Sequence, residues 1–200
     1  MMKVSWLRAV RKDVLSVLVV VGILCASLVQ GSAFAKKDFD QLIAEADQIF
    51  LGTVTALDSR KEPTGAIVTE VTFSTARVLK GAETGTMILE VLGGTVGEET
   101  MEVGGVPKFE IGVTYLVFAK DNRTAVFPIV GGAQGLYQIR RDETTGKDMI
   151  LNAYGMPLAS DTITAVTQPA SSIPQGALPS PAPVSLDTFV QAIQSRLGRP

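Results

Sequence analysis

The sequence contains no histidine, and its one cysteine and one tryptophan both lie within the first 35 of its 200 residues. Without histidine, the Ser-His-Asp and Cys-His pairs that activate nucleophiles are excluded, and with so little cysteine the usual zinc sites are excluded as well. No lysine has a serine three positions before it, so the Ser-x-x-Lys arrangement is also missing. We therefore expect no catalytic set of these kinds, no metal site and no cofactor.

Residues 1–35 predict a secretory signal peptide. Basic residues precede the apolar run 14–28, and an Ala-x-Ala pattern predicts cleavage between Ala35 and Lys36. The apolar run is short for a membrane span of about twenty residues, which favours a signal peptide over the alternative, an uncleaved anchor. The protein is then expected to be exported, either periplasmic or extracellular, and to touch the membrane only through this segment before cleavage.

Basic charge is scarce in the remaining chain. Residues 1–35 hold four of the 18 basic and one of the 20 acidic residues, so the mature chain has a net charge of −5. A mildly acidic chain without a basic run has no electrostatic footprint for nucleic acid or anionic lipid. It also has no cysteine for disulfides, so its stability must come from its core.

Residues 36–167 alternate short apolar runs with turn residues, which predicts a mainly β domain. Strands are expected at 48–58, 66–79, 86–92, 113–119, 136–141 and 148–153. The run 113–119 is nearly all apolar and should be covered on both faces, whereas 66–79 alternates and should be half-buried. Strands of this length with short turns and little helix form antiparallel β-barrels or sandwiches.

A short helix is expected within 38–47, where Asp38 and Gln41 match a capping box. Its apolar residues recur at helical spacing. The mature domain therefore begins with a helix that enters the first strand.

The chain ends in a linker and an amphipathic helix. The linker, 168–184, holds five of the ten prolines and no charge. The helix, within 185–200, has apolar residues at helical spacing, with Ser185 placed to cap it and Gly198 to end it. Because an isolated helix of this length is marginal in water, it should dock, either on the strands or on a partner.

The segment 92–112 carries six glycines and resembles a phosphate cradle at first sight. Such a cradle needs converging N–H groups and usually a lysine after the glycines. Here the glycines lead into Glu98, Glu99 and Glu102, which would repel a phosphate. We expect a mobile, exposed loop instead, serving either as a binding loop through these glutamates or as a solvent-facing connection.

A series of short motifs carries a family resemblance. EADQIFLGTVTAL, a strand ending in ARVLKG, TMILEV, a glycine-containing loop and YLVFA follow one another in this order. The series resembles the netrin-like domain of tissue inhibitors of metalloproteinases, and exported bacterial proteins with a GG loop and a Gly-x-x-Tyr-Leu stretch, here Gly112 to Leu116. The likeness covers about residues 39–140 and implies an OB-like, five-stranded antiparallel Greek-key barrel with helices packed outside it.

In such a barrel, glycines occupy bulges and corners that disfavour a Cβ. The structural motif would comprise Gly93, Gly94, Gly112, Tyr115, Gly131, Gly132 and Gly135. The inhibitory mechanism of the animal proteins does not carry over, because they bind the protease zinc through an N-terminal cysteine and this mature chain begins at Lys36 without any cysteine. OB barrels that bind nucleic acid use basic grooves, which the net charge also opposes.

Two hypotheses for function follow. The first is an exported, non-catalytic binding module, directed at a protease or another envelope or extracellular ligand. The second is a histidine-free polysaccharide hydrolase that uses two carboxylates, which would have to face one another across a cleft about 5 to 10 Å wide.

Two smaller motifs remain. Asp142 and Asp148 have the spacing of a calcium loop but lack its full pattern, and a hairpin turn is expected there. Asn122-Arg123-Thr124 is a glycosylation sequon, which marks a surface turn.

Overall fold

The computed structural model describes residues 35–106, 108–124, 127–158 and 184–198. The predicted signal peptide, apart from Ala35, and the predicted linker, apart from Val184, lie outside these residues. Within them, neither helix is long and apolar enough to cross a bilayer.

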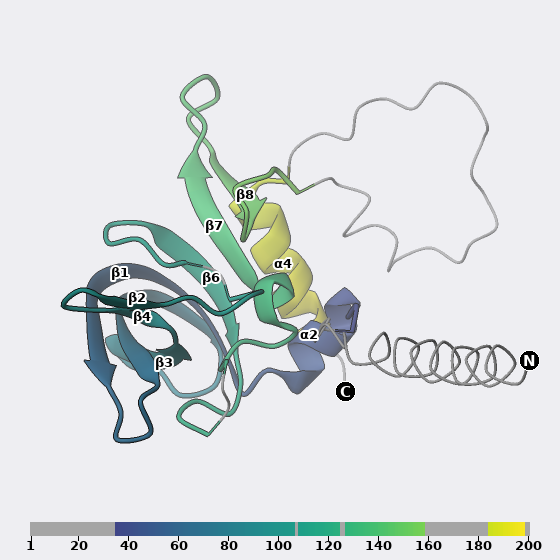
Figure 1. Cartoon of the computed structure of the whole chain (residues 1–200). Helices are drawn as coiled ribbons and strands as arrows, with labels where there is room; N and C mark the ends of the chain where they lie inside the picture. The colour runs from purple at the N-terminus through teal and green to yellow at the C-terminus, as the bar shows by residue number, and fades with distance from the viewer. Residues whose placement is uncertain (1–34, 107, 125–126, 159–183, 199–200) are drawn as a thin grey trace, which may run out of the picture. The chain divides into compact units, whose positions relative to one another are not determined.

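The described part of the chain is mainly antiparallel β, as the sequence predicts (Figure 1). Its strands are β1 (Gln48–Lys61), β2 (Ile67–Lys80), β3 (Thr86–Leu92), β4 (Gly94–Val96), β5 (Glu99–Met101), β6 (Thr114–Ala119), β7 (Leu136–Arg141) and β8 (Asp148–Asn152). The helices are α2 (Phe39–Glu45), the 3-10 turn η1 (Gly132–Gly135) and α4 (Leu186–Leu197). The predicted bounds of β3 and β7 agree with the observed ones, whereas β1 ends three residues later than predicted.

Six strands form one sheet in the order β3-β2-β1-β6-β7-β8, and β4 pairs with β5 in a separate small sheet. Because β6 returns to lie beside β1, the four strands β6-β1-β2-β3 follow the order of a Greek key. The sheet ends at β3 on one side and at β8 on the other, so strand pairing does not close it into the predicted barrel. β1 shifts register against β2 at three places, and such bulges increase the bend and twist of a strand pair.

The sheet separates two apolar cores. The helix-side core contains α2, α4 and the strand residues Ile49, Leu116, Phe118, Tyr137 and Ile150. The opposite, inner core contains Phe50, Val54, Val71, Phe73, Leu89, Val91, Phe109, Tyr115, Val117 and Leu136. β6 contributes alternate residues to both cores, which confirms that this apolar strand is covered on both faces.

Both helices form where the sequence predicts them. In α2 the Asp38 side chain accepts a hydrogen bond from Gln41 N while the Gln41 side chain accepts one from Asp38 N, which completes the capping box. In α4, Ser185 caps the first turn, and Phe189 and Ile193 are buried in the helix-side core. The C-terminal helix therefore docks on its own chain.

Candidate functional site

The glycine-rich segment leaves β3 and folds back over the inner face of the sheet as the β4–β5 hairpin. Gly93 N donates to the carbonyl of Ile67 over 2.7 Å, and Ile67 N donates to Met101 Sδ over 3.3 Å. Both contacts tie the hairpin to the start of β2. The sequence predicts only a loop here, because strands of three residues are too short to show a period.

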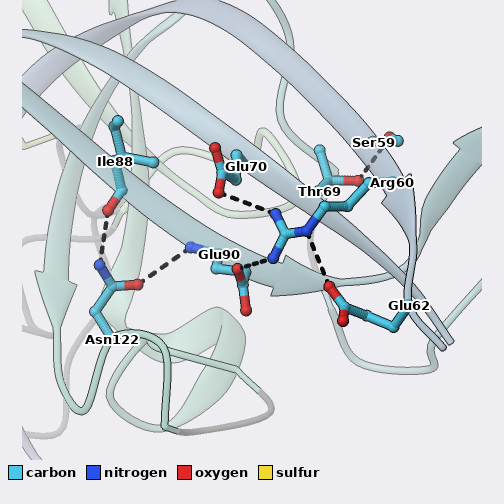
Figure 2. A network of polar contacts seen from close by, with 8 residues as sticks. All are labelled: Ser59, Arg60, Glu62, Thr69, Glu70, Ile88, Glu90 and Asn122. Atoms are coloured by element: carbon cyan, nitrogen blue, oxygen red, sulfur yellow. Dashed lines mark hydrogen bonds and ion pairs between the residues drawn. The ribbon is translucent and has the colours of Figure 1, made fainter. Parts of the chain in front are cut away.

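Two hydroxyls and a glycine fix the base of the hairpin. Thr69 Oγ1 donates to the carbonyl of Gly93 over 2.6 Å and lies 2.8 Å from Ser59 Oγ. Because a hydroxyl has one proton, Ser59 must be the donor in their shared hydrogen bond, which is drawn in Figure 2. A Cβ on Gly94 would lie 2.2 Å from Thr69 Oγ1, and the φ of Gly94 is +135°. Only glycine fits this position.

Between the hairpin and the sheet lies a cavity of about 520 Å³. One wall comes from the sheet, and the other comes from the hairpin and the loop that follows it. The apolar side chains of the walls are Leu57, Val71, Val91, Leu92, Met101, Val103, Val106 and Phe109. Ser59 and Thr69 are the polar groups at the sheet side, and their hydroxyls already hold the hairpin. A cavity of this size with mostly apolar walls and few polar groups is typical of a small-molecule site.

A chain of aromatic rings supports the cavity from the inner core. Phe73 packs edge-on against Phe50 and Phe109, with ring centroids 5.3 and 5.7 Å apart, and Phe109 packs against Tyr115 at 5.3 Å. The Tyr115 hydroxyl accepts a hydrogen bond from Glu110 N over 3.2 Å. Burial raises the pKa of Tyr115, so its phenol stays neutral. Phe73 and Tyr115 are both buried in the inner core, with 0% and 1% of their surfaces exposed.

Two of the three predicted loop glutamates are ion-paired. Glu99 Oε2 lies 2.5 Å from Lys61 Nζ at the end of β1, and Glu102 Oε1 lies 2.8 Å from Lys108 Nζ. The hydrogen bond from Lys108 lowers the pKa of the Glu102 carboxyl. Glu98 is exposed in the turn between β4 and β5 and has no ion pair among the described residues. Lysines therefore balance the negative charge of two of the three glutamates.

Only Glu102 and Lys108 carry charge among the described residues of the cavity wall. Their side chains are 70% and 83% exposed, which places the pair at the solvent side of the cavity. Glu98 and Glu99 do not contribute to the wall. The structure thus brings one of the three predicted glutamates to the cavity and leaves the other two on the outer surface of the hairpin.

The outer face of the same strands carries a charged cluster (Figure 2). Glu70 and Glu90 lie directly opposite one another on β2 and β3, an arrangement that destabilises a sheet unless it is compensated. Arg60 compensates it, since its guanidinium contacts Glu62 and Glu70 at 2.9 Å and Glu90 at 2.5 Å. The hydrogen bond with Glu90 raises the pKa of Arg60 further. This cluster holds together the three strands that form the sheet side of the cavity.

The other predicted residues lie away from the cavity. Gly112, Gly131 and Gly132 have positive φ angles of 85°, 64° and 63° in connections around β6 and η1. A Cβ on Gly135 would lie 2.4 Å from the carbonyl oxygen of Val130, so a side chain is excluded there. These glycines shape the fold and contribute nothing to the cavity wall.

Ala35 and Lys36, the residues of the predicted cleavage site, are both exposed. The side-chain amide of Gln134 in η1 holds the chain on either side of them: its Nε2 donates to the carbonyl of Ala35 over 3.0 Å, and its Oε1 accepts from Lys37 N over 2.8 Å. The folded domain thus fixes the main chain where the sequence predicts the mature N-terminus.

The segment 142–148 forms the predicted hairpin turn between β7 and β8. Asp142 accepts hydrogen bonds from the backbone N–H groups of Thr144 and Thr145, which lower the pKa of its carboxyl. Its oxygens therefore stabilise the turn itself. In the part of the chain that the structure describes, no group of three or more His, Cys, Asp or Glu side chains is placed to hold a metal ion.

Comparison with known proteins found no family model, no curated protein and no solved structure that matches this chain.

The cavity itself was not predicted from the sequence. The one available signal was Thr69, a polar residue on the buried side of a strand whose other inward residues are Ile67, Val71 and Phe73.

Proposed function

We propose that this chain is an exported, non-catalytic binding module and that it binds its ligand in the cavity under the β4–β5 hairpin. The cavity carries the proposal: about 520 Å³ is the size of a small-molecule site, and its walls are mostly apolar. The arrangement also explains one glycine of the segment 92–112, since Gly94 lets the hairpin approach β2 closely enough to form the second wall.

The walls indicate the chemical class of the ligand. Burying a charged group without a partner is costly, and the charged wall residues Glu102 and Lys108 already pair with each other at the solvent side. Ser59 uses its proton on Thr69, but its oxygen keeps the capacity to accept. The ligand is therefore an uncharged, largely apolar molecule that donates at most one or two hydrogen bonds inside the cavity.

The proposed fold is the OB-like arrangement implied by the netrin-like resemblance, in a partly open form. The order β6-β1-β2-β3 supports it, because OB folds are partly open Greek-key barrels. The position of α2 and α4 on the face of the sheet opposite the inner core also supports it. A protease as the partner rests on this resemblance alone.

The carboxylate hydrolase gains no support from the cavity. Its described wall contains a single carboxylate, Glu102, whose pKa is lowered, whereas a general acid needs a raised one. Glu70 and Glu90 do lie side by side, but both are bound by Arg60 on the outer face of the sheet.

The binding proposal is tested with N-phenyl-1-naphthylamine, an uncharged apolar probe that fluoresces when bound. We expect saturable binding to the wild-type protein. Val103→Phe, which fills space at the cavity wall, should weaken binding about tenfold or more, a change of about 1.4 kcal/mol in binding free energy. Ile111→Phe is the matched control, because Ile111 is 64% exposed and outside the wall. If Val103→Phe and Ile111→Phe bind the probe equally well, the cavity is not the binding site.

Export is tested separately. Protein recovered from outside the cytoplasm should begin at Lys36 when its intact mass is measured. An N-terminus that retains residues 1–35 would contradict cleavage. A pull-down from the native envelope or culture supernatant then tests for a protein partner.

A further inference from the structure

The edge of β3 that pairs with no other strand is hydrogen-bonded by a side chain. Asn122 Nδ2 donates to the carbonyl of Ile88 over 2.7 Å, and Asn122 Oδ1 accepts from Glu90 N over 3.1 Å (Figure 2). Asn122 is half-buried in the connection that follows β6. A primary amide can present its C=O and one of its two N–H groups on the same side, as the N–H and C=O of a single residue in a neighbouring strand do. Asn122 therefore takes the place that a neighbouring strand would have at the middle of β3.

The opposite edge of the sheet is covered by main chain. Ile150 N on β8 donates to the carbonyl of Val184 over 3.1 Å, and Leu158 N donates to the carbonyl of Ile150 over 3.2 Å. Uncovered strand edges promote pairing with other chains. Within the described residues, Asn122 is thus the counterpart at β3 of the backbone that covers β8.

The turn that carries Asn122 is strained and firmly anchored. Its neighbours Asp121 and Arg123 have φ angles of 50° and 69°, and they are the only described residues other than glycine with positive φ. Asp121 N donates to Asp47 Oδ2 over 3.0 Å, and Thr124 N donates to the carbonyl of Asp121 over 3.0 Å. Strain of this kind persists where the surrounding structure enforces it and often marks a site with a role. Here the strained turn presents the Asn122 amide to β3.

We propose that Asn122 prevents β3 from pairing with another chain, and that the partner this edge fits is β3 of a second copy. Two antiparallel β3 strands related by a two-fold axis at Leu89 would place Glu90 of each copy opposite Ile88 of the other, so no like charges would face each other. The Glu90 carboxylate is moreover held by Arg60 of its own chain. The residues of the sequon thus have a structural role that needs no carbohydrate, and this inference is independent of the ligand proposed for the cavity.

The first test compares Asn122→Ala with Thr124→Ala in the mature protein. Thr124→Ala also abolishes the sequon and loses the hydrogen bond from Thr124 Oγ1 to the carbonyl of Asp121, but it keeps the Asn122 amide and the backbone hydrogen bond of the turn. We expect Asn122→Ala to form a concentration-dependent dimer in sedimentation velocity at tens to hundreds of micromolar, whereas wild type and Thr124→Ala remain monomeric. In dilute Asn122→Ala, hydrogen exchange of the Glu90 amide should be about tenfold faster or more, since its acceptor is gone.

Two further variants make the result decisive. Asn122→Asp keeps an acceptor for Glu90 N but loses the donor to Ile88, so it should protect the Glu90 amide better than Asn122→Ala does. Adding Thr86→Lys to Asn122→Ala places a charge at the exposed start of β3 and should restore the monomer while Glu90 exchange stays fast. The proposal is overturned if Asn122→Ala stays monomeric at these concentrations, whether or not Glu90 exchange changes, or if Thr86→Lys leaves its dimer intact.

Discussion

Gly94 lies directly against Thr69, so closely that a Cβ on Gly94 would be 2.2 Å from Thr69 Oγ1. This approach joins the hairpin to the sheet and thereby creates the cavity. Gly94→Ala should lower the stability by several kcal/mol, because a φ of +135° lies beyond the left-handed helical region that a residue with a Cβ can adopt and because the new Cβ would clash with the Thr69 hydroxyl. Chemical denaturation measures the loss.

Gly97 provides the matched control for that experiment. It also has a positive φ, +61°, but nothing lies within 4 Å of its would-be Cβ. Gly97→Ala should therefore cost only the backbone strain of about 1–2 kcal/mol. If both substitutions cost the same, the contact with Thr69 does not hold the hairpin.

The aromatic chain under the cavity predicts large losses on truncation. Phe73→Ala and Tyr115→Ala should each lower the free energy of unfolding by about 3–5 kcal/mol, as expected for large buried side chains. Tyr154→Ala is the control, because Tyr154 is 71% exposed and should change stability by less than about 0.5 kcal/mol. A loss under about 1 kcal/mol at Phe73 or Tyr115 would place that ring outside the core.

The loop glutamates should matter little for folding. Replacing Glu98, Glu99 and Glu102 together by Gln should leave the melting temperature within a few degrees of wild type, because the ion pairs of Glu99 and Glu102 are exposed. Binding of the uncharged probe should also be unchanged. If a charged partner recognises this loop instead, its association should slow in the triple variant and in high salt alike.

The Glu102–Lys108 pair predicts a small effect of pH. The pKa of Glu102 is lowered from 4.5 in the folded protein, so its stabilising contribution is present above the unfolded pKa and is lost as the pH falls through the folded one. The difference in melting temperature between wild type and Glu102→Gln should therefore shrink as the pH falls below 4.5. It should also shrink in 1 M salt at neutral pH; a difference that persists in acid would contradict the assignment to this pair.

The local parts of the fold could be predicted from the sequence because their causes are local. Asp38 and Gln41 define the start of α2, Ser185 and Gly198 bound α4, and the alternation in 86–92 defines β3. The cavity depends on Ser59, Thr69 and Gly94, which come from three segments and meet only after the strands pair. Contacts between residues so far apart leave no periodic pattern in the sequence from which they could be predicted.

The same limit applies to the closure of the sheet. The resemblance implies a barrel, but whether β3 meets another strand depends on where the connection after β6 lies. Asn122, recognisable in the sequence only as part of a sequon, makes hydrogen bonds to β3 that a strand would otherwise make. Its partner positions are more than thirty residues away along the chain.

Whether the cavity under the β4–β5 hairpin binds the ligand can be seen residue by residue when backbone amide shifts are mapped by NMR during titration with N-phenyl-1-naphthylamine. We expect saturating shifts at Thr69, Gly93, Gly94 and Met101, which line the cavity. We expect no such shifts at Tyr154 and Met156, which are exposed apolar residues outside the cavity wall. Shifts centred on Tyr154 and Met156, with the cavity residues unmoved, would contradict binding in the cavity.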